Sequence, residues 1–345
     1  DELRIYNRAL TESEIQELSG IVKKQICFSQ VTDSIKQVDP NSYFKFETDC
    51  NGKPTTETVK AYLSRSVMFS NNHDGRFLDE KIGTIISTQT KFLHYFDYSW
   101  TDEVMGSYFD YFNQKDYFDS NEKLWARQIH QSDPEIILEG GLMEYIYKGS
   151  IDKTPIPSWA FNEFNKPVEN RNFRYNDMIF TDGYGVNEWG TDRSIPDITR
   201  TETRMYYYYL ARRYIDSGFE AIWFGQIHRT GENDINGGYT KDLIDRIRKY
   251  AKDNARRKGV IISSHTLGFP NPENNIFDYT SWPAANIHLD PTTKKLSMDI
   301  PPSYYQTTSG KTSAPPTNNV PHIFDFDYWG CPDTTSLFSA GGYQS

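Results

Sequence analysis

The sequence has few cysteines, no long apolar run and no excess of basic residues. Its 3 cysteines are too few for a disulfide scaffold, although Cys27 and Cys50 flank a short segment and could pair in an oxidising compartment. No stretch approaches the roughly 20 apolar residues that span a bilayer, and the opening DELRIY lacks the layout of a signal peptide. We therefore expect no membrane insertion.

A surplus of basic charge is also missing. The chain carries 37 lysines and arginines against 47 aspartates and glutamates, and the basic residues are dispersed along it. Because phosphate backbones bind to basic faces, we expect no nucleic-acid partner. A neutral or cationic ligand fits the net charge of −10 better.

Several catalytic motifs are absent as well. The chain has no GxGxxG, no P-loop, no G-x-S-x-G nucleophile elbow, and no HExxH or HxH spacing. These absences argue against nucleotide-dependent and serine-hydrolase chemistry. We expect no cofactor, and no metal site is assigned.

What the chain does have is a set of short apolar runs that each end in polar side chains. The residues at these ends are Glu139, Asp182, Gln226 with His228, His265, and Asp325 with Asp327. Strands buried on both faces read as continuous apolar runs, and parallel α/β barrels carry their chemistry where such strands end. The pattern predicts a polar cleft at one end of a parallel barrel.

Amphipathic segments separate these runs, as crossovers between parallel strands require. Helices are predicted over 201–217 and 240–258, where glycines at 218 and 259 mark the stops, and a third over 121–131. We predict an α/β fold, a (β/α)8 barrel of the TIM type that is complete or cut short at its C-terminus. KFLHYFDYSW is its predicted first strand.

The first twenty residues carry a different signal. LRIY reads as a short alternating strand, and Thr11 with Glu14 reads as a capping box that opens a helical turn. The whole segment, DELRIYNRALTESEIQELSG, resembles the closing strand and helix turn of laminin-G-like, concanavalin-type jelly-roll domains. The alternative is a simple N-terminal helix.

That resemblance implies a multidomain architecture. Residues 1–20 would be the tail of a jelly-roll module, 21–85 a linker with a short N-terminal β lead-in, and 86–345 a TIM-barrel-like catalytic domain. Residues 271–319, rich in proline, asparagine, threonine and serine, are expected to form a long loop. The resemblance also implies a secreted or cell-surface protein, with adjacent domains of a larger chain as partners.

Three carboxylates are the candidate catalytic groups, since cleavage of a glycosidic bond needs two carboxyl groups flanking it. We expect Glu139 to be the acid/base and Asp325 or Asp327 the nucleophile or base. Glu139 closes IILE just before Gly140 and Gly141, which would leave room for a ligand. Asp325 and Asp327 share one face of HIFDFDYWG. Two like charges close together raise the pKa of one carboxyl group, as a general acid requires. Ion pairs with neighbouring strands are the alternative.

Other residues are candidates for substrate binding. Strand alternation would project Gln226 and His228 together into the cleft, with His265 close to them. Asp182 would border the cleft, or form an ordinary Asx turn with Gly183. Two tryptophans, Trp189 and Trp329, offer surfaces on which sugar rings stack.

Strand-end carboxylates, aromatic residues and the jelly-roll tail together resemble the barrel glycoside hydrolases of extracellular proteins. The resemblance is architectural, because no family acid/base signature such as N-E-P is present. The hypothesis is a glycosidase that uses paired carboxylates on a carbohydrate ligand. Two alternatives stay open: a non-catalytic glycan-binding barrel of an adhesin, and a metal-dependent hydrolase that uses the histidines.

Overall fold

The computed structural model describes residues 45–68, 78–97, 123–265, 276–282, 286–289, 292–293, 296–299 and 321–324. The predicted jelly-roll tail at 1–20 lies outside these residues. So do Asp325, Asp327, Trp329 and Cys27. No helix among the described residues is both long enough and apolar enough to cross a membrane.

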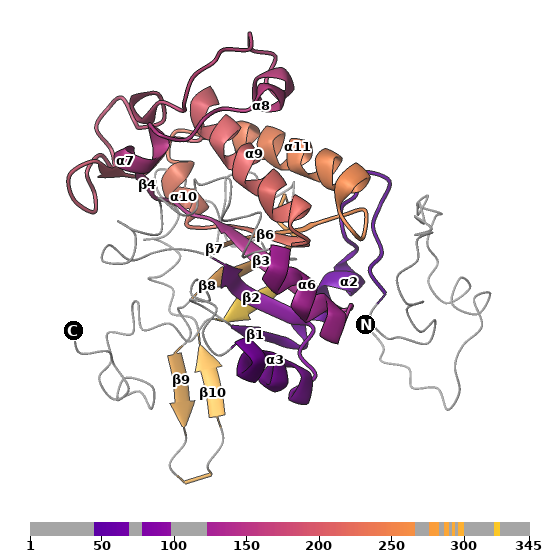
Figure 1. The fold of residues 1–345 in the computed structure, drawn as a ribbon. Coiled ribbons are helices and arrows are strands. Elements are labelled where there is room, and N and C mark those ends of the chain that lie inside the picture. The colour runs from indigo at the N-terminus through magenta and orange to yellow at the C-terminus, as the bar shows by residue number, and fades with distance from the viewer. Residues whose placement is uncertain are drawn as a thin grey trace, which may run out of the picture.

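The centre of the structure is a seven-stranded sheet in which every neighbouring pair is parallel. Its strands, in spatial order, are β1 (Ser66–Met68), β2 (Phe92–Asp97), β3 (Ile137–Leu142), β6 (Ala221–Phe224), β7 (Ile261–His265), β8 (Tyr279–Trp282) and β11 (His322–Phe324). The spatial order follows the chain order, as in a barrel wall, whereas a doubly wound sheet reverses direction at a switch point. The parallel α/β prediction is confirmed (Figure 1).

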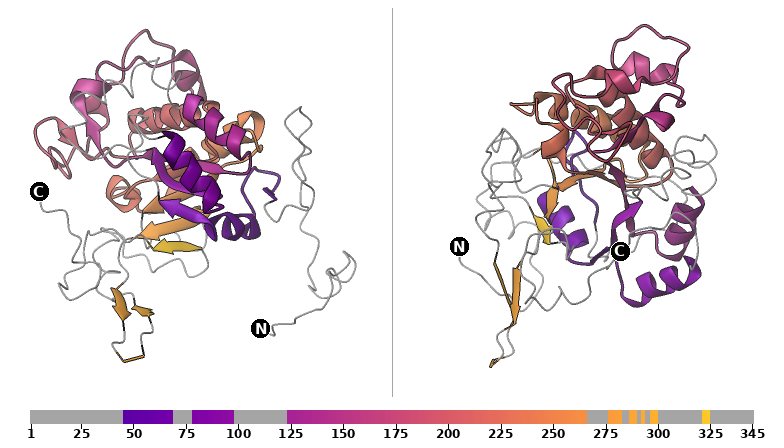
Figure 2. Two further views of the ribbon diagram at one scale, coloured as in Figure 1. Left: turned by 60° about the horizontal axis from the view of Figure 1, so that its bottom comes forward. Right: turned by 90° about the vertical axis from the view of Figure 1, so that its left-hand side faces the viewer.

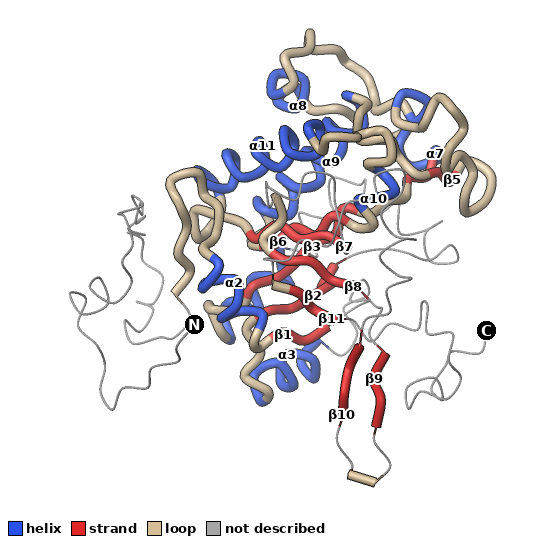
Figure 3. Tube along the Cα trace, turned by 180° about the vertical axis from the view of Figure 1, so that it is seen from behind, coloured by secondary structure: helices blue, strands red, loops and turns tan. Residues whose placement is uncertain are grey.

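Contacts across the sheet show that it is strongly curled. Three strand spacings, roughly 14 Å on a flat sheet, separate β3 from β8, yet the Tyr279 hydroxyl donates to Glu139 at 2.5 Å. The Tyr95 hydroxyl on β2 likewise lies 2.8 Å from Ser281 Oγ on β8. The described strands therefore form a curved wall (Figure 3). They do not by themselves show the full eight-stranded barrel.

Helices follow the strands as the sequence predicts. The three predicted helices appear as α6 (Lys123–Ser132), α9 (Thr201–Asp216) and α11 (Gly238–Asn254). Gly218 ends α9 with φ of +98°, a conformation that glycine tolerates best. The other helices are α2 (Thr56–Leu63), α3 (Leu78–Ser87), α7 (Lys148–Ile151), α8 (Ser158–Glu163), α10 (Ile227–Thr230) and the 3₁₀ turn Tyr175–Asp177.

Alternation along the strands divides the core into two parts. Side chains on the outer face, including Leu138, Ile222 and Ile262, pack into one cluster with α9 and α11. On the concave face, Phe92 and Ile137 join a second cluster with residues of α2 at the amino ends of the strands. The remaining inward positions are largely polar or aromatic.

Three details of the predicted strands are wrong. KFLHYF forms β2, the second strand of the sheet, because Ser66–Met68 pairs in front of it. The run MIF before Asp182 joins no sheet: Ile179 makes a single bridge to Pro196, and Met178 O accepts from Thr203 Oγ1 at the start of α9.

The third error concerns the predicted long loop at 271–319. It contains β8 and an antiparallel hairpin of β9 (Asn286–Leu289) and β10 (Leu296–Asp299). The hairpin projects away from the sheet in Figures 1 and 2. A second small pair joins β4 (Ile146–Tyr147) to β5 (Arg193–Ser194).

Candidate active site

Glu139 is the central polar residue of the concave face. It is the third residue of β3, and its side chain is completely buried. Oε1 accepts from Ser263 Oγ at 2.6 Å and from the Tyr279 hydroxyl at 2.5 Å. Oε2 pairs with His94 Nδ1 at 2.6 Å and accepts from Tyr95 N at 3.2 Å. Two carboxylate oxygens offer about four acceptor sites, so these partners occupy them all.

The glycine after Glu139 has a structural purpose rather than a ligand-binding one. A Cβ on Gly140 would lie 2.5 Å from the ring of Tyr214, a residue of α9. Gly140 therefore allows α9 to pack closely on the outer face of β3. The expectation that this glycine makes room for a ligand is wrong.

Tyr95 lies in an unusual backbone conformation at the site. Its φ is +51°, and the register of β2 against β3 shifts between Leu93 and Asp97. A shift of this kind re-aims side chains, and here the rings of His94 and Tyr95 lie close together with centroids 3.6 Å apart. Positive φ at a bulky residue is strained and gathers at functional sites.

His265 lies at the end of β7, as the sequence predicts. Its Nδ1 is 2.8 Å from the Tyr95 hydroxyl, and its ring centroid is 5.9 Å from that of Trp223 on β6. His265 is only partly buried, unlike Glu139. It is the histidine of this group that a ligand reaches most easily.

The strand alternation predicted for Gln226 and His228 is wrong, because β6 ends before both residues. β6 ends at Phe224, Gln226 lies at the N-cap of α10, and His228 lies inside this short helix. Glu144 explains the break, because its carboxylate accepts from Gln226 N at 3.0 Å and from Gln226 Nε2 at 2.7 Å. A Cβ on Gly225 would lie 2.0 Å from Glu144 Oε2. This position therefore needs a glycine for the chain to pass so close to the carboxylate.

His228 is kept neutral by its surroundings. Burial, together with the nearby charges of His265 and Arg229, lowers its pKa to about 3. Neutral imidazole can accept and donate hydrogen bonds, as contacts to sugar hydroxyls require. It cannot serve as a cationic acid near neutral pH.

Aromatic side chains line the carboxyl end of the concave face. Tyr95, Tyr145 and Trp223 form one buried cluster with Met143, and Tyr147 and Trp189 pack against it. The ring centroids of Tyr145 and Trp189 are 5.4 Å apart, and the Arg229 guanidinium lies 5.4 Å from the Trp189 ring. Trp189 is thus held at the edge of this cluster, where it remains partly exposed.

Asp182 lies in a turn after Phe180 and Thr181. It is exposed, and its Oδ1 accepts from Tyr184 N at 3.1 Å. This is the Asx turn that the sequence offered as the alternative. Within the described ranges, no three His, Cys, Asp or Glu side chains group closely enough to hold a metal ion.

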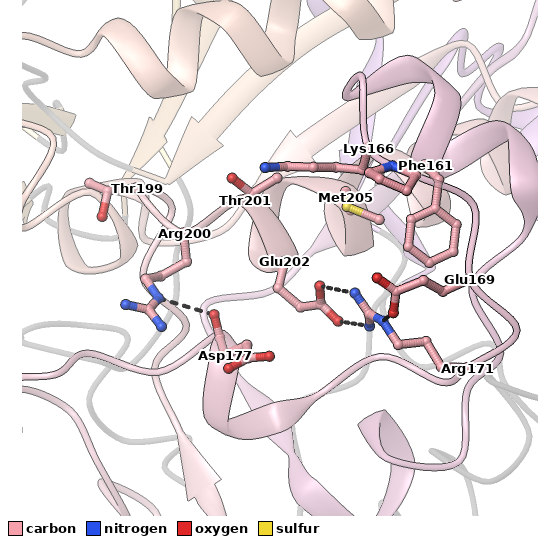
Figure 4. A pocket seen from close by; sticks show the side chains of 11 residues that line it. Phe161, Lys166, Glu169, Arg171, Asp177, Thr199, Arg200, Thr201, Glu202 and Met205 are labelled. Carbon is pink, nitrogen blue, oxygen red and sulfur yellow. Dashed lines mark hydrogen bonds and ion pairs between the residues drawn. The ribbon is translucent and has the colours of Figure 1, made fainter.

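A separate hollow of about 460 Å³ lies at the start of α9 (Figure 4). Arg171 dominates it by binding both oxygens of Glu202, at 2.6 and 3.1 Å, and Glu169 at 2.8 Å. Its ion pairs hold together the loop in front of α9. None of the residues predicted for the active site lines it.

No family model and no curated protein sequence matches the chain. Among solved structures, the GH27 β-L-arabinopyranosidase of Geobacillus stearothermophilus is 17% identical with a TM-score of 0.29, over 47% of this chain and 34% of that one. The glycoside hydrolase domain of PelA from Pseudomonas aeruginosa is 6% identical (TM-score 0.27; 52% and 62%). A trehalulose synthase MutB mutant is 12% identical (TM-score 0.35; 63% and 48%).

The chain therefore spans about a third of the length of the arabinopyranosidase and less than two thirds of the other two proteins. All three are named as enzymes that act on carbohydrates. The superpositions are partial.

Proposed function

We propose that the concave face of the sheet binds a glycan and hydrolyses one of its glycosidic bonds. The supporting observation is the contrast between the two faces of the sheet. The outer face is apolar, whereas the concave face gathers a buried carboxylate, two histidines and a cluster of aromatic rings. Parallel barrels bind substrates at the carboxyl ends of their strands.

In this proposal Glu139 has a positioning role and not the acid/base role expected from the sequence. Because both of its oxygens are saturated, it has no free lone pair for a substrate proton. Instead it holds the ring of His94 and the backbone of Tyr95, and through Tyr95 the ring of His265. We assign His265 and Tyr95 to the binding of sugar hydroxyls, and Trp189 to stacking against a sugar ring.

The acid and base are assigned to Asp325 and Asp327. They are the first and third residues after Phe324, the last residue of β11, and β11 pairs in parallel with β8. Retaining hydrolysis needs carboxyl groups roughly 5 Å apart, and inverting hydrolysis needs about 6.5 to 9.5 Å. The separation of these two carboxyl groups would therefore decide the stereochemistry.

The test is reducing-end release from a panel of neutral plant, algal and host polysaccharides by wild type, Asp325→Asn and Asp327→Asn. Asp253→Asn is the matched control, because Asp253 is an exposed aspartate in the last turn of α11. We expect turnover by wild type and the control, and loss in at least one of the other variants. Equal turnover in all four proteins would remove the aspartates from the mechanism.

A non-catalytic glycan-binding barrel is the second candidate. The observation in its favour is that Glu139 and Glu144, the described carboxylates of this face, are both buried and hydrogen-bonded. Glycan binding without turnover by any of the proteins would select it. Under either function, the secreted or cell-surface location implied by residues 1–20 remains part of the proposal.

A further inference from the structure

A second hollow, of about 590 Å³, lies at the start of α11. Its volume falls in the range of pockets that bind small molecules, roughly 300 to 1,000 Å³. Its lining includes Arg204, Asn233, Ile235, Asn236, Tyr239 and Asp242. The proposed glycan mechanism uses none of them.

Two large apolar side chains of this hollow face solvent. Ile235 is 68% exposed and Tyr239 is 47% exposed. A cation supports the tyrosine, because the Arg204 guanidinium lies 4.6 Å from the ring centroid. Arg204 is itself buried and donates to Ile198 O at 2.9 Å and Thr199 O at 2.7 Å. The ring therefore rests on a fixed base.

The loop that carries these residues is well braced. Asp234 Oδ2 accepts from both the backbone nitrogen and the hydroxyl of Thr240 at 2.8 Å, and Oδ1 accepts from Tyr239 N at 3.1 Å. Both oxygens of this carboxylate accept hydrogen bonds that stabilise the loop. Asn233 and Asn236, which precede and follow Ile235 in the sequence, are exposed.

The hollow lies at the same end of the fold as the candidate active site. It is part of the connection from β6 to α11, and a helix that follows a parallel strand starts at the carboxyl end of that strand. The same connection begins with Gln226, which Glu144 anchors to the end of β3. One continuous segment thus joins the rim of the concave face to the hollow.

We propose that this hollow is an accessory binding site for a neutral polysaccharide chain whose other part occupies the concave face. The proposal rests on the proposed function, because the two sites would hold the same polymer. An aromatic ring can pack against the C–H face of a sugar, while amide and carboxylate groups bind its hydroxyls. A neutral polymer is favoured because the protein carries a net charge of −10.

The test is affinity gel electrophoresis in dextran, xylan, galactomannan and laminarin, together with hydrolysis of each polymer and of its trisaccharide. The variants are Tyr239→Ala and Tyr239→Phe, with Leu124→Ala as the matched control, since Leu124 is 45% exposed on α6. Loss of one stacking contact corresponds to about ten-fold weaker binding.

We expect Tyr239→Ala to bind its polymer about ten-fold more weakly. Tyr239→Phe and Leu124→Ala should bind like wild type, and all variants should cleave the trisaccharide like wild type. Unchanged polymer binding by Tyr239→Ala, or an equal loss on polymer and trisaccharide, would overturn the accessory site while leaving the hydrolase intact. Polymer binding that depends on Tyr239 without any hydrolysis would support the accessory site and reject the hydrolase.

Discussion

Glu139 and Glu220 are both completely buried, and they lie on adjacent chain segments of the same sheet. Glu220 precedes β6 and is paired with two cations, Arg256 at 2.7 Å and Arg257 at 3.0 Å. Burial raises the pKa of Glu220, but the two guanidinium groups outweigh it and bring the pKa below its usual value. Glu220, Arg256 and Arg257 form a cluster of ion pairs that stabilises the amino end of the sheet.

Glu139 is compensated differently. Its partners among the described residues are two hydroxyls, a backbone amide and a histidine, and none of them is a lysine or arginine. Hydroxyl and backbone donors give a carboxylate less charge compensation than an arginine pair does. Equal burial can therefore have different structural roles: Glu220 forms ion pairs at the amino end of the sheet, and Glu139 orders His94 and Tyr95 on the concave face.

The largest expected effect comes from breaking the Glu220 pair. Arg257→Leu leaves a buried carboxylate with half its compensation, and Arg257 also donates to Tyr62 and Pro134. We expect a loss of about 3 to 5 kcal/mol in the free energy of unfolding, measured by urea denaturation. Lys241→Met, which removes an exposed ion pair with Asp245, should change it by less than about 1 kcal/mol. Equal losses would refute the structural role.

The next effect is a pH dependence that arises beside Glu220. Burial lowers the pKa of His130 to about 4, and the charge of Arg256 contributes, while its Nε2 lies 3.1 Å from Ile136 O. A histidine whose folded pKa lies below the ordinary 6.5 contributes stability that is complete above 6.5 and is lost as pH falls toward 4. The loss is on the order of 3 kcal/mol.

His130→Gln isolates this contribution, because glutamine can still donate to Ile136 O without titrating. At pH 7 wild type should have the larger free energy of unfolding. At pH 4.5 the free energies of unfolding of wild type and His130→Gln should be nearly equal. A constant difference between them across that interval would show that His130 does not titrate as its surroundings require.

Glu139→Gln should have a smaller effect on stability. The amide keeps the shape of the side chain but turns one acceptor into a donor that faces other donors. We expect a loss of about 1 to 3 kcal/mol in unfolding free energy. Ser263→Ala, which removes only one of the four partners, should cost about 1 kcal/mol. A Glu139→Gln protein as stable as wild type would mean that the four contacts do not form together.

Tyr95→Phe should have the smallest effect on the fold. It removes the hydroxyl that contacts His265 and Ser281 and leaves the ring in place. We expect about 1 kcal/mol of lost stability together with a raised KM for the cleaved glycan and little change in kcat. A fall in kcat alone would show that Tyr95 acts on the reacting bond and not on binding.

The sequence predicts the parallel scaffold well, because apolar runs, helical spacing and glycine stops are local signals. The helix at 201–217 and the strand end at His265 follow from such signals. Errors arise where one distant residue decides the local structure. Strand alternation does not reach Gln226, because β6 ends before it. Gln226 instead donates hydrogen bonds to Glu144, which is distant in the sequence.

The environment of Glu139 shows the same limit. Its partners come from β2, β7 and β8, and no spacing in the sequence connects them. The positive φ of Tyr95, which directs its backbone N–H toward Glu139, is equally invisible in the sequence. Glu139 could therefore be selected as a candidate from its strand, but its saturated state could not.

The most direct measurement is the kcat/KM of Glu139→Gln and Glu220→Gln on the polysaccharide that wild type cleaves best, at a temperature where circular dichroism shows both variants folded. We predict about a hundred-fold lower kcat/KM for Glu139→Gln, because the hydroxyl-binding groups it holds become misplaced, and a wild-type kcat/KM for Glu220→Gln. Equal kcat/KM values for the two folded variants would contradict the functional distinction between these glutamates.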